Sequence, residues 1–202
     1  MGKHRCLEFF VEHGVDLPDP PVMALHRGRV DLLEEHLRRD PKLLTRTFSH
    51  REIYDPGLIW NGEPFAANGT TLDGTTLLHM CIDFFEMPIA RWLIDHGMDA
   101  TVKAAVDDDG FGGHTPLFNC VVRQLGSDGT PDFARLLLDH GADPNVRASL
   151  RKRLVGADDE AMHEYRGVTP LEWGRQFHDE EFVDKEAMKV IEAVSPSSSV
   201  GR

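Results

Sequence analysis

The sequence is poor in cysteine and has no long apolar run, and each shortage excludes a class of protein. Its three cysteines, Cys6, Cys81 and Cys120, show no CxxC or other metal-binding spacing, and so sparse and odd a count favours reduced thiols. No apolar stretch approaches the roughly 20 residues of a membrane-spanning helix, and none follows the basic N-terminus as a secretory signal would. We therefore expect a cytoplasmic protein without a membrane partner.

Positive charge is scarce as well. Lysine and arginine together number 22 against 34 aspartates and glutamates, which gives a formal net charge of −12. A stripe of basic residues able to neutralise phosphates is hard to build on such a chain, so nucleic acid is a poor candidate partner. An acidic surface instead favours a basic protein partner.

Short segments recur along the chain and are typical of the two ends of a helix pair. Residues 74–79, 113–118 and 167–172 share one pattern, and residues 7–16, 90–99 and 134–143 share another. Each of the first group contains a threonine suited to capping a helix start, followed in two cases by proline. Each of the second group places a glycine just after an apolar helix, where a left-handed residue ends it. The pattern predicts consecutive helix pairs that stack to form a core.

These segments resemble the ankyrin repeat, whose T-P-L-H-x-A helix start recurs about every 33 residues. A degenerate further unit spans residues 20–37. The resemblance implies an all-α, ankyrin-type helix-turn-helix solenoid with long inserted finger loops. We expect one ankyrin repeat domain at 1–194, followed by a flexible tail at 195–202. Within it we expect a half repeat at 5–16 and repeats at about 19–44, 74–100, 113–145 and 167–194.

Three insertions stretch the repeat at equivalent places, at about residues 45–72, 100–113 and 146–167. In ankyrin-like folds this link is the β-hairpin finger beside the concave face, so we expect the insertions to stack on one edge of the solenoid. Loops of this length are usually functional or disordered. Their many apolar and aromatic residues argue against disorder and indicate that the fingers pack on each other.

Opposite charges in the second and third fingers suggest a contact between them. The acidic run 107–109 and the basic run 151–153 could pair across neighbouring fingers, or could form a solvated rim. The fingers are then either a structural cap or a recognition edge. If they are a recognition edge, replacing Arg151, Lys152 and Arg153 together by alanine should weaken partner binding and hardly change the melting temperature. Candidate partner contacts are Tyr54, Trp60, Phe65, Phe111, Arg151, Lys152, Arg153 and Tyr165.

Most of the histidines lie at sequence positions that indicate structural roles. His13, His96 and His140 occupy one slot before the terminal glycine of a helix, and such a repeated residue is usually structural. By the resemblance, His79 takes the T-P-L-H position, which ties neighbouring loops by hydrogen bonds. His50, His114 and His163 lie in or beside the fingers, but no His-x-x-x-His or His-Glu-x-x-His spacing supports a metal site.

No motif indicates catalysis. The acidic turn at 107–110 lacks the alternation of a calcium loop, and no nucleophile elbow or phosphate-binding loop is present. We therefore expect no enzyme activity, no cofactor and no metal.

The tryptophans divide into three kinds. Trp92 falls on the core face of a second helix. Trp173 lies early in the first helix of the last repeat. The ankyrin family prefers a small residue there, so we expect atypical packing at this position. Trp60, in the first finger, is a candidate for an exposed anchor, because tryptophan is enriched at interaction hot spots.

The N-terminal segment resembles a second helix without its first helix. Cys6, Phe9, Phe10 and Val11 would then be partly uncovered or repacked, because solenoids normally protect their ends with capping repeats. Three explanations stay open: a truncated or misassigned start, an atypical cap, or a dimer contact. We expect a monomer or a weak dimer formed through this end.

The resemblance implies a protein–protein interaction module that binds through its concave face and finger loops. Two alternatives remain. One is an acidic, immunity-like inhibitor that blocks a basic partner, and the other is a small-ligand or enzyme site between the fingers.

Overall fold

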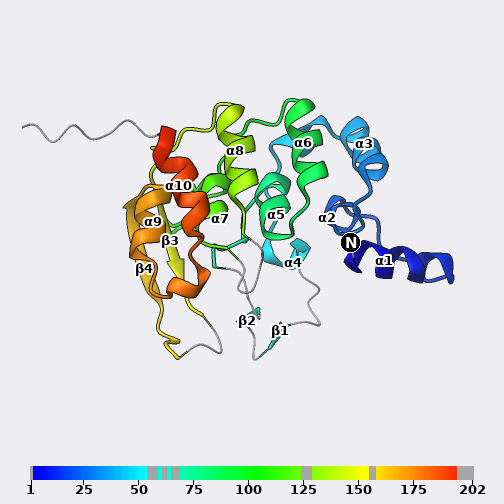
Figure 1. Cartoon of the computed structure of the whole chain (residues 1–202). Coiled ribbons are helices and arrows are strands. Elements are labelled where there is room, and N and C mark those ends of the chain that lie inside the picture. Colours follow the sequence, from blue (N-terminus) through cyan, green and yellow to red (C-terminus); the bar gives the residue numbers. More distant parts are fainter. Residues whose placement is uncertain are drawn as a thin grey trace, which may run out of the picture.

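The computed structural model describes residues 2–53, 59–60, 63–64, 69–123, 129–154 and 158–194, and it arranges most of them as a row of helix pairs. Figure 1 shows the pairs side by side, from the blue N-terminal end to the red C-terminal end. The inner helices are α2 (Pro21–His26), α5 (Leu77–Asp83), α7 (Pro116–Val121) and α9 (Pro170–Gln176). Their outer partners are α3 (Val30–Arg39), α6 (Met87–Asp95), α8 (Pro131–Asp139) and α10 (Lys185–Val194). Further helices are α1 (Gly2–Glu12), α4 (His50–Ile53), η1 (Pro41–Leu44) and η3 (Glu180–Phe182).

Threonine sets the start of three inner helices, as the sequence predicts. Thr76, Thr115 and Thr169 are the N-caps of α5, α7 and α9. At Thr169 the cap is reciprocal, because Glu172 N donates to the threonine hydroxyl (3.3 Å) and Thr169 N donates to the Glu172 carboxylate (2.9 Å). The predicted helix pairs are therefore confirmed at these starts.

The glycines that follow the apolar helices take the expected left-handed conformation. Gly97 and Gly141, after α6 and α8, have φ angles of 94° and 86°, and Gly14, after α1, has 83°. Only glycine adopts such angles at little cost, so these positions end the helices.

The histidines before these glycines have one common role. The Nδ1 atoms of His13, His96 and His140 each lie 2.8 Å from the carbonyl oxygen four residues earlier. Each ring thus adds a side-chain hydrogen bond to a carbonyl in the last turn of its own helix. The prediction of a structural role is confirmed.

The insertions add short strands to the helical repeat. Strand β3 (Ala148–Lys152) pairs antiparallel with β4 (His163–Val168), and β1 (Ile59–Trp60) pairs with β2 (Glu63–Pro64). Main-chain hydrogen bonds link the second finger to both sides: Ala105 N donates to Gly74 O (2.8 Å), just after the first finger, and Gly112 N donates to Ser149 O (2.7 Å) of the third finger. The helical repeat is confirmed, and the strands make the description all-α only roughly correct.

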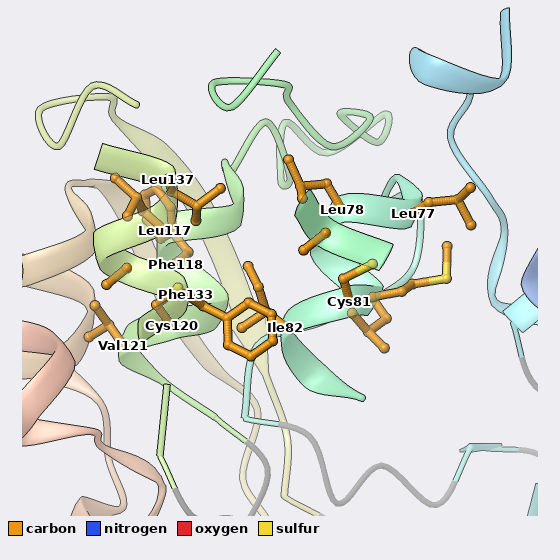
Figure 2. Close-up of a cluster of buried hydrophobic side chains, with 14 of the residues drawn as sticks. Leu77, Leu78, Cys81, Ile82, Leu117, Phe118, Cys120, Val121, Phe133 and Leu137 are labelled. Carbon is orange, nitrogen blue, oxygen red and sulfur yellow. The ribbon is translucent and has the colours of Figure 1, made fainter. Parts of the chain in front are cut away.

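The core runs continuously through the pairs. Figure 2 shows its centre, where Leu78 and Ile82 of α5 face Leu117 and Phe118 of α7, with Phe133 of α8 beside them. Each helix pair is too small to bury its own apolar face, and stacking on its neighbour completes the burial. Trp92 packs against this core partly buried. Within the described ranges, no helix has both the length and the apolar character needed to cross a membrane.

Candidate functional site

The inner helices α5 and α7 have no exposed face. All seven residues of α5 and all six residues of α7 are buried. A helical solenoid usually binds through the concave surface that its inner helices line. Other segments of this chain must therefore cover that surface here.

The end of the first insertion covers α7. Thr70 is fully buried, and its hydroxyl lies 2.8 Å from Val122 O and 3.2 Å from Phe118 O. The Trp173 indole Nε1 donates to the Thr70 hydroxyl oxygen at 3.1 Å. Trp173 itself is fully buried, so a large aromatic side chain fills the position where we expect atypical packing. The first insertion thus extends from the finger edge onto the inner helices.

The third finger contributes a buried lysine. Burial alternates along β3, so that Ala148, Leu150 and Lys152 point inward, and Lys152 is only 7% exposed. Its ammonium group lies in electrostatic range of Asp83, the last residue of α5. Burial lowers the pKa of Lys152 to about 8, and the charge of Asp83 partly offsets this effect. Our interpretation of Lys152 as an exposed basic contact is wrong, because it overlooked this alternation.

The pKa of Asp83 is also shifted by burial. It is 2% exposed, and the Asn119 side-chain amide donates to its Oδ1 at 3.2 Å. Burial raises the pKa of the Asp83 carboxyl to about 7, against the lowering effects of Asn119 and Lys152. Asp83 and Asn119 therefore join two inner helices by a buried hydrogen bond, and Lys152 of the third finger acts on Asp83 through its charge.

A groove with a volume of about 210 Å³ lies where the three fingers meet. Its lining comes from all three insertions and consists of Thr71, Asp73, Gly74, Ala105, Val106, Asp107, Phe111, Gly112, Leu150 and Arg151. Gly112 has a φ of 115°, and a Cβ atom there would lie 1.9 Å from Ala105 O. Only glycine permits this close approach within the second finger, so Gly112 shapes the groove.

Ion pairs bind the second finger to the third beside this groove. Arg151 donates from Nη2 to Asp107 Oδ2 (2.7 Å) and from Nη1 to Asp109 Oδ2 (2.9 Å). The hydrogen bond from Phe111 N is the largest cause that lowers the pKa of Asp107. The predicted pairing of the acidic and basic runs is confirmed for Arg151.

Two arginines cover the aromatic ring of the second finger. The guanidinium carbons of Arg151 and Arg166 lie 4.7 and 4.3 Å from the centroid of Phe111. Phe111 is consequently only 5% exposed. The expectation that the fingers pack on each other is confirmed at this ring.

The remaining predicted contacts are scattered. Tyr165 is 7% exposed and packs against Trp173 at 4.6 Å between ring centroids, with its hydroxyl 2.7 Å from His178 Nδ1. Arg153 is partly exposed and donates from Nε to Glu160 O (2.9 Å). Trp60 belongs to strand β1. Tyr54, Phe65 and the tail 195–202 lie outside the described residues.

Sequence reasoning missed Val106. This side chain lines the groove and is 62% exposed, the highest value among the exposed large hydrophobic residues that the structure describes. A single valine between Ala105 and Asp107 has no periodic pattern around it, so no sequence signal distinguishes it. Val106 thus places an exposed apolar side chain on the rim of the groove.

The histidines considered for a metal site do not form one in the described part of the chain. There, no group of three histidine, cysteine, aspartate or glutamate side chains could hold a metal ion. His114 is fully buried, and burial lowers its pKa to about 4. Its backbone carbonyl accepts a hydrogen bond from His79 Nε2 (3.1 Å), which confirms the tie between neighbouring loops.

Comparison with known proteins identifies the repeat. A family model for ankyrin repeats, comprising three copies, matches residues 50–148. A search of curated proteins found no match. The matched region contains the pairs α5–α6 and α7–α8, with the insertions on either side of the first pair. Residues 50–148 therefore consist of ankyrin repeats, and the match supports an ankyrin repeat protein.

Proposed function

We propose that this protein recognises another protein through the groove between its three fingers. Ankyrin repeats generally serve as protein–protein interaction modules. The observation that carries the proposal is Val106, an apolar side chain 62% exposed on the rim of a groove to which all three insertions contribute. The inner helices α5 and α7 offer no exposed surface, so the fingers replace the concave face as the proposed contact.

The described parts of the fingers are tied to one another and can present such a surface. Main-chain hydrogen bonds link finger to finger, and Arg151 joins the second to the third with two ion pairs. A surface held in place before binding loses little conformational entropy on association. This arrangement supports recognition by a preformed edge.

A Val106→Asp variant tests the proposal, with Val194→Asp as its control. Val194 is 54% exposed at the end of α10, outside the groove, so the control adds the same charge at a similarly exposed valine. Immobilised wild-type protein and Val194→Asp should retain the same proteins from an extract of the native host, and Val106→Asp should lose them. Equal retention by Val106→Asp would show that the groove is not the recognition surface.

The net charge supports a second candidate, an inhibitor that blocks a basic protein. With a formal charge of −12, the chain should attract a basic partner over a distance that salt shortens. Retention that is strong at low salt and lost at high salt, and equal for both aspartate variants, would favour this candidate over the groove.

A further inference from the structure

Helix α1 occupies the position of an outer helix, but its core face is uncovered. The common histidine slot aligns α1 with α6 and α8. On that alignment, Cys6 and Phe10 correspond to residues that are at most 5% exposed in the complete pairs: Ile89, Leu93, Phe133 and Leu137. Phe10 is 49% exposed and Cys6 is exposed as well. The outward face of α1 is thus the face that elsewhere packs on an inner helix.

The opposite face of α1 is fixed to the rest of the molecule. His4 Nε2 lies 2.7 Å from Glu86 Oε1, and Glu8 accepts hydrogen bonds from Arg27 Nε (2.6 Å) and Arg29 Nη1 (3.2 Å). Figure 1 shows α1 projecting from the end of the row. These contacts hold the apolar face outward, so it cannot be buried by a simple rotation of the helix.

Charges of opposite sign flank the apolar face. Arg5, Cys6, Phe9 and Phe10 surround a hollow of about 410 Å³, and Phe9 is 53% exposed. Glu12 lies two helical turns after Arg5, and seven residues of α-helix bring both side chains to nearly the same side. Within the described residues, neither Arg5 nor Glu12 forms an ion pair, although both are exposed.

We propose that this face is a two-fold contact between two copies of the chain, with their α1 helices antiparallel. A two-fold axis between residues 8 and 9 places Arg5 of each copy opposite Glu12 of the other, so the charges complement each other twice. At a rise of 1.5 Å per residue, the two Phe9 residues lie roughly 1.5 Å apart along the helix direction and pack near the axis. The sequence of α1 is therefore complementary to itself in this orientation.

The size of the face sets the strength of the association. Two helices of 11 residues each bury less than the roughly 1,200 Å² of a standard stable interface. We therefore expect a weak dimer that forms at high protein concentration.

Analytical ultracentrifugation of the full chain at low salt tests the contact, from about 10 μM to about 1 mM, a range suited to weak complexes. Wild-type protein should shift from monomer to dimer across this range. Phe9→Asp should remain a monomer, and Val106→Asp, which changes an exposed valine in the fingers, should dimerise like wild type. A wild-type protein that stays monomeric throughout overturns the proposal, as does dimerisation that Val106→Asp abolishes and Phe9→Asp leaves intact.

A charge swap tests the antiparallel orientation separately. Arg5→Glu and Glu12→Arg each place like charges opposite one another and should weaken dimerisation several-fold at low salt. The double variant Arg5→Glu/Glu12→Arg recreates both pairs and should recover the wild-type dissociation constant. Single variants that dimerise as well as wild type contradict this orientation. A helix that has unfolded is recognised by a loss of far-ultraviolet circular dichroism.

Discussion

Asp83 and Lys152 are ionisable residues in a place that water hardly reaches, and their pKa values show the cost. The folded protein favours the neutral carboxylic acid, since burial raises the pKa of Asp83 to about 7. It also disfavours the ammonium ion, since burial lowers the pKa of Lys152 to about 8. Near neutral pH the two charges offset part of each other's burial cost, but such a pair is seldom more stable than an apolar contact.

This shift predicts a pH-dependent benefit from Asp83→Asn. Because the folded pKa of Asp83 is raised from 3.8 to about 7, the stabilisation from its bound proton is complete below about pH 4 and is lost as the pH rises through 7. Asparagine stays neutral at every pH. The free energy of unfolding of the variant should therefore rise relative to that of wild type by a few kcal/mol from pH 5 to pH 8, at about 1.4 kcal/mol per pKa unit. Urea unfolding at both pH values measures this difference. A difference that does not change with pH would contradict the assignment.

Arg151 and Lys152 are neighbours in sequence, yet their substitutions should have different effects. Replacing the partly exposed Arg151 by alanine removes two ion pairs in solvent and should lower the free energy of unfolding by about 1 kcal/mol or less. Lys152→Met keeps the buried stem and removes the ammonium ion, so stability at pH 6 should stay the same or rise. Thermal unfolding of both variants at pH 6 checks this. A loss above about 2 kcal/mol for Lys152→Met would mean that its charge is needed for the fold.

At the scale of elements, the segment around Thr70 covers inner-helix surface that would otherwise be exposed. It lies against α7 and is held by Trp173 of α9, so a part of the first insertion becomes core. Isosteric Thr70→Val should cost roughly 1–3 kcal/mol, because it leaves the buried indole N–H and the Val122 carbonyl without this partner. Thr101→Val, at a less buried turn threonine, is the control and should cost less. Chemical denaturation followed by tryptophan fluorescence measures both, and equal costs would refute the role of Thr70.

The elements differ in how far the sequence could predict them. Thr76, Thr115 and Thr169 start helices through chemistry within three residues, so their roles follow from local pattern. The contact of Thr70 with Trp173 joins residues 103 positions apart, and no local pattern encodes it. The groove could not be predicted for the same reason, because it forms only when three separate insertions stack.

At the scale of the whole molecule, the protection of backbone amides from hydrogen exchange should follow burial along the row of helix pairs. The helices α5 and α7 are buried on every side, whereas α1 is attached through a few polar contacts at the end. We expect amide hydrogens of α5 and α7 to exchange most slowly and those of α1 to exchange fastest, because weakly packed elements open locally. Hydrogen exchange followed by mass spectrometry, at a concentration that keeps the chain monomeric, measures this order. Equal protection of α1 and α5 in the monomer would contradict it.

The hydrogen bond between Trp173 and Thr70 has a consequence for how this protein folds. In a simple solenoid each repeat touches only its neighbours, so stability is nearly a sum of local terms and a terminal repeat can melt alone. Here a residue of the last inner helix holds the segment that covers the middle of the row. Loss of the C-terminal pair therefore exposes α7 as well, and the chain should unfold in one cooperative transition. Closing such a distant contact also slows folding relative to a solenoid built from neighbouring contacts alone.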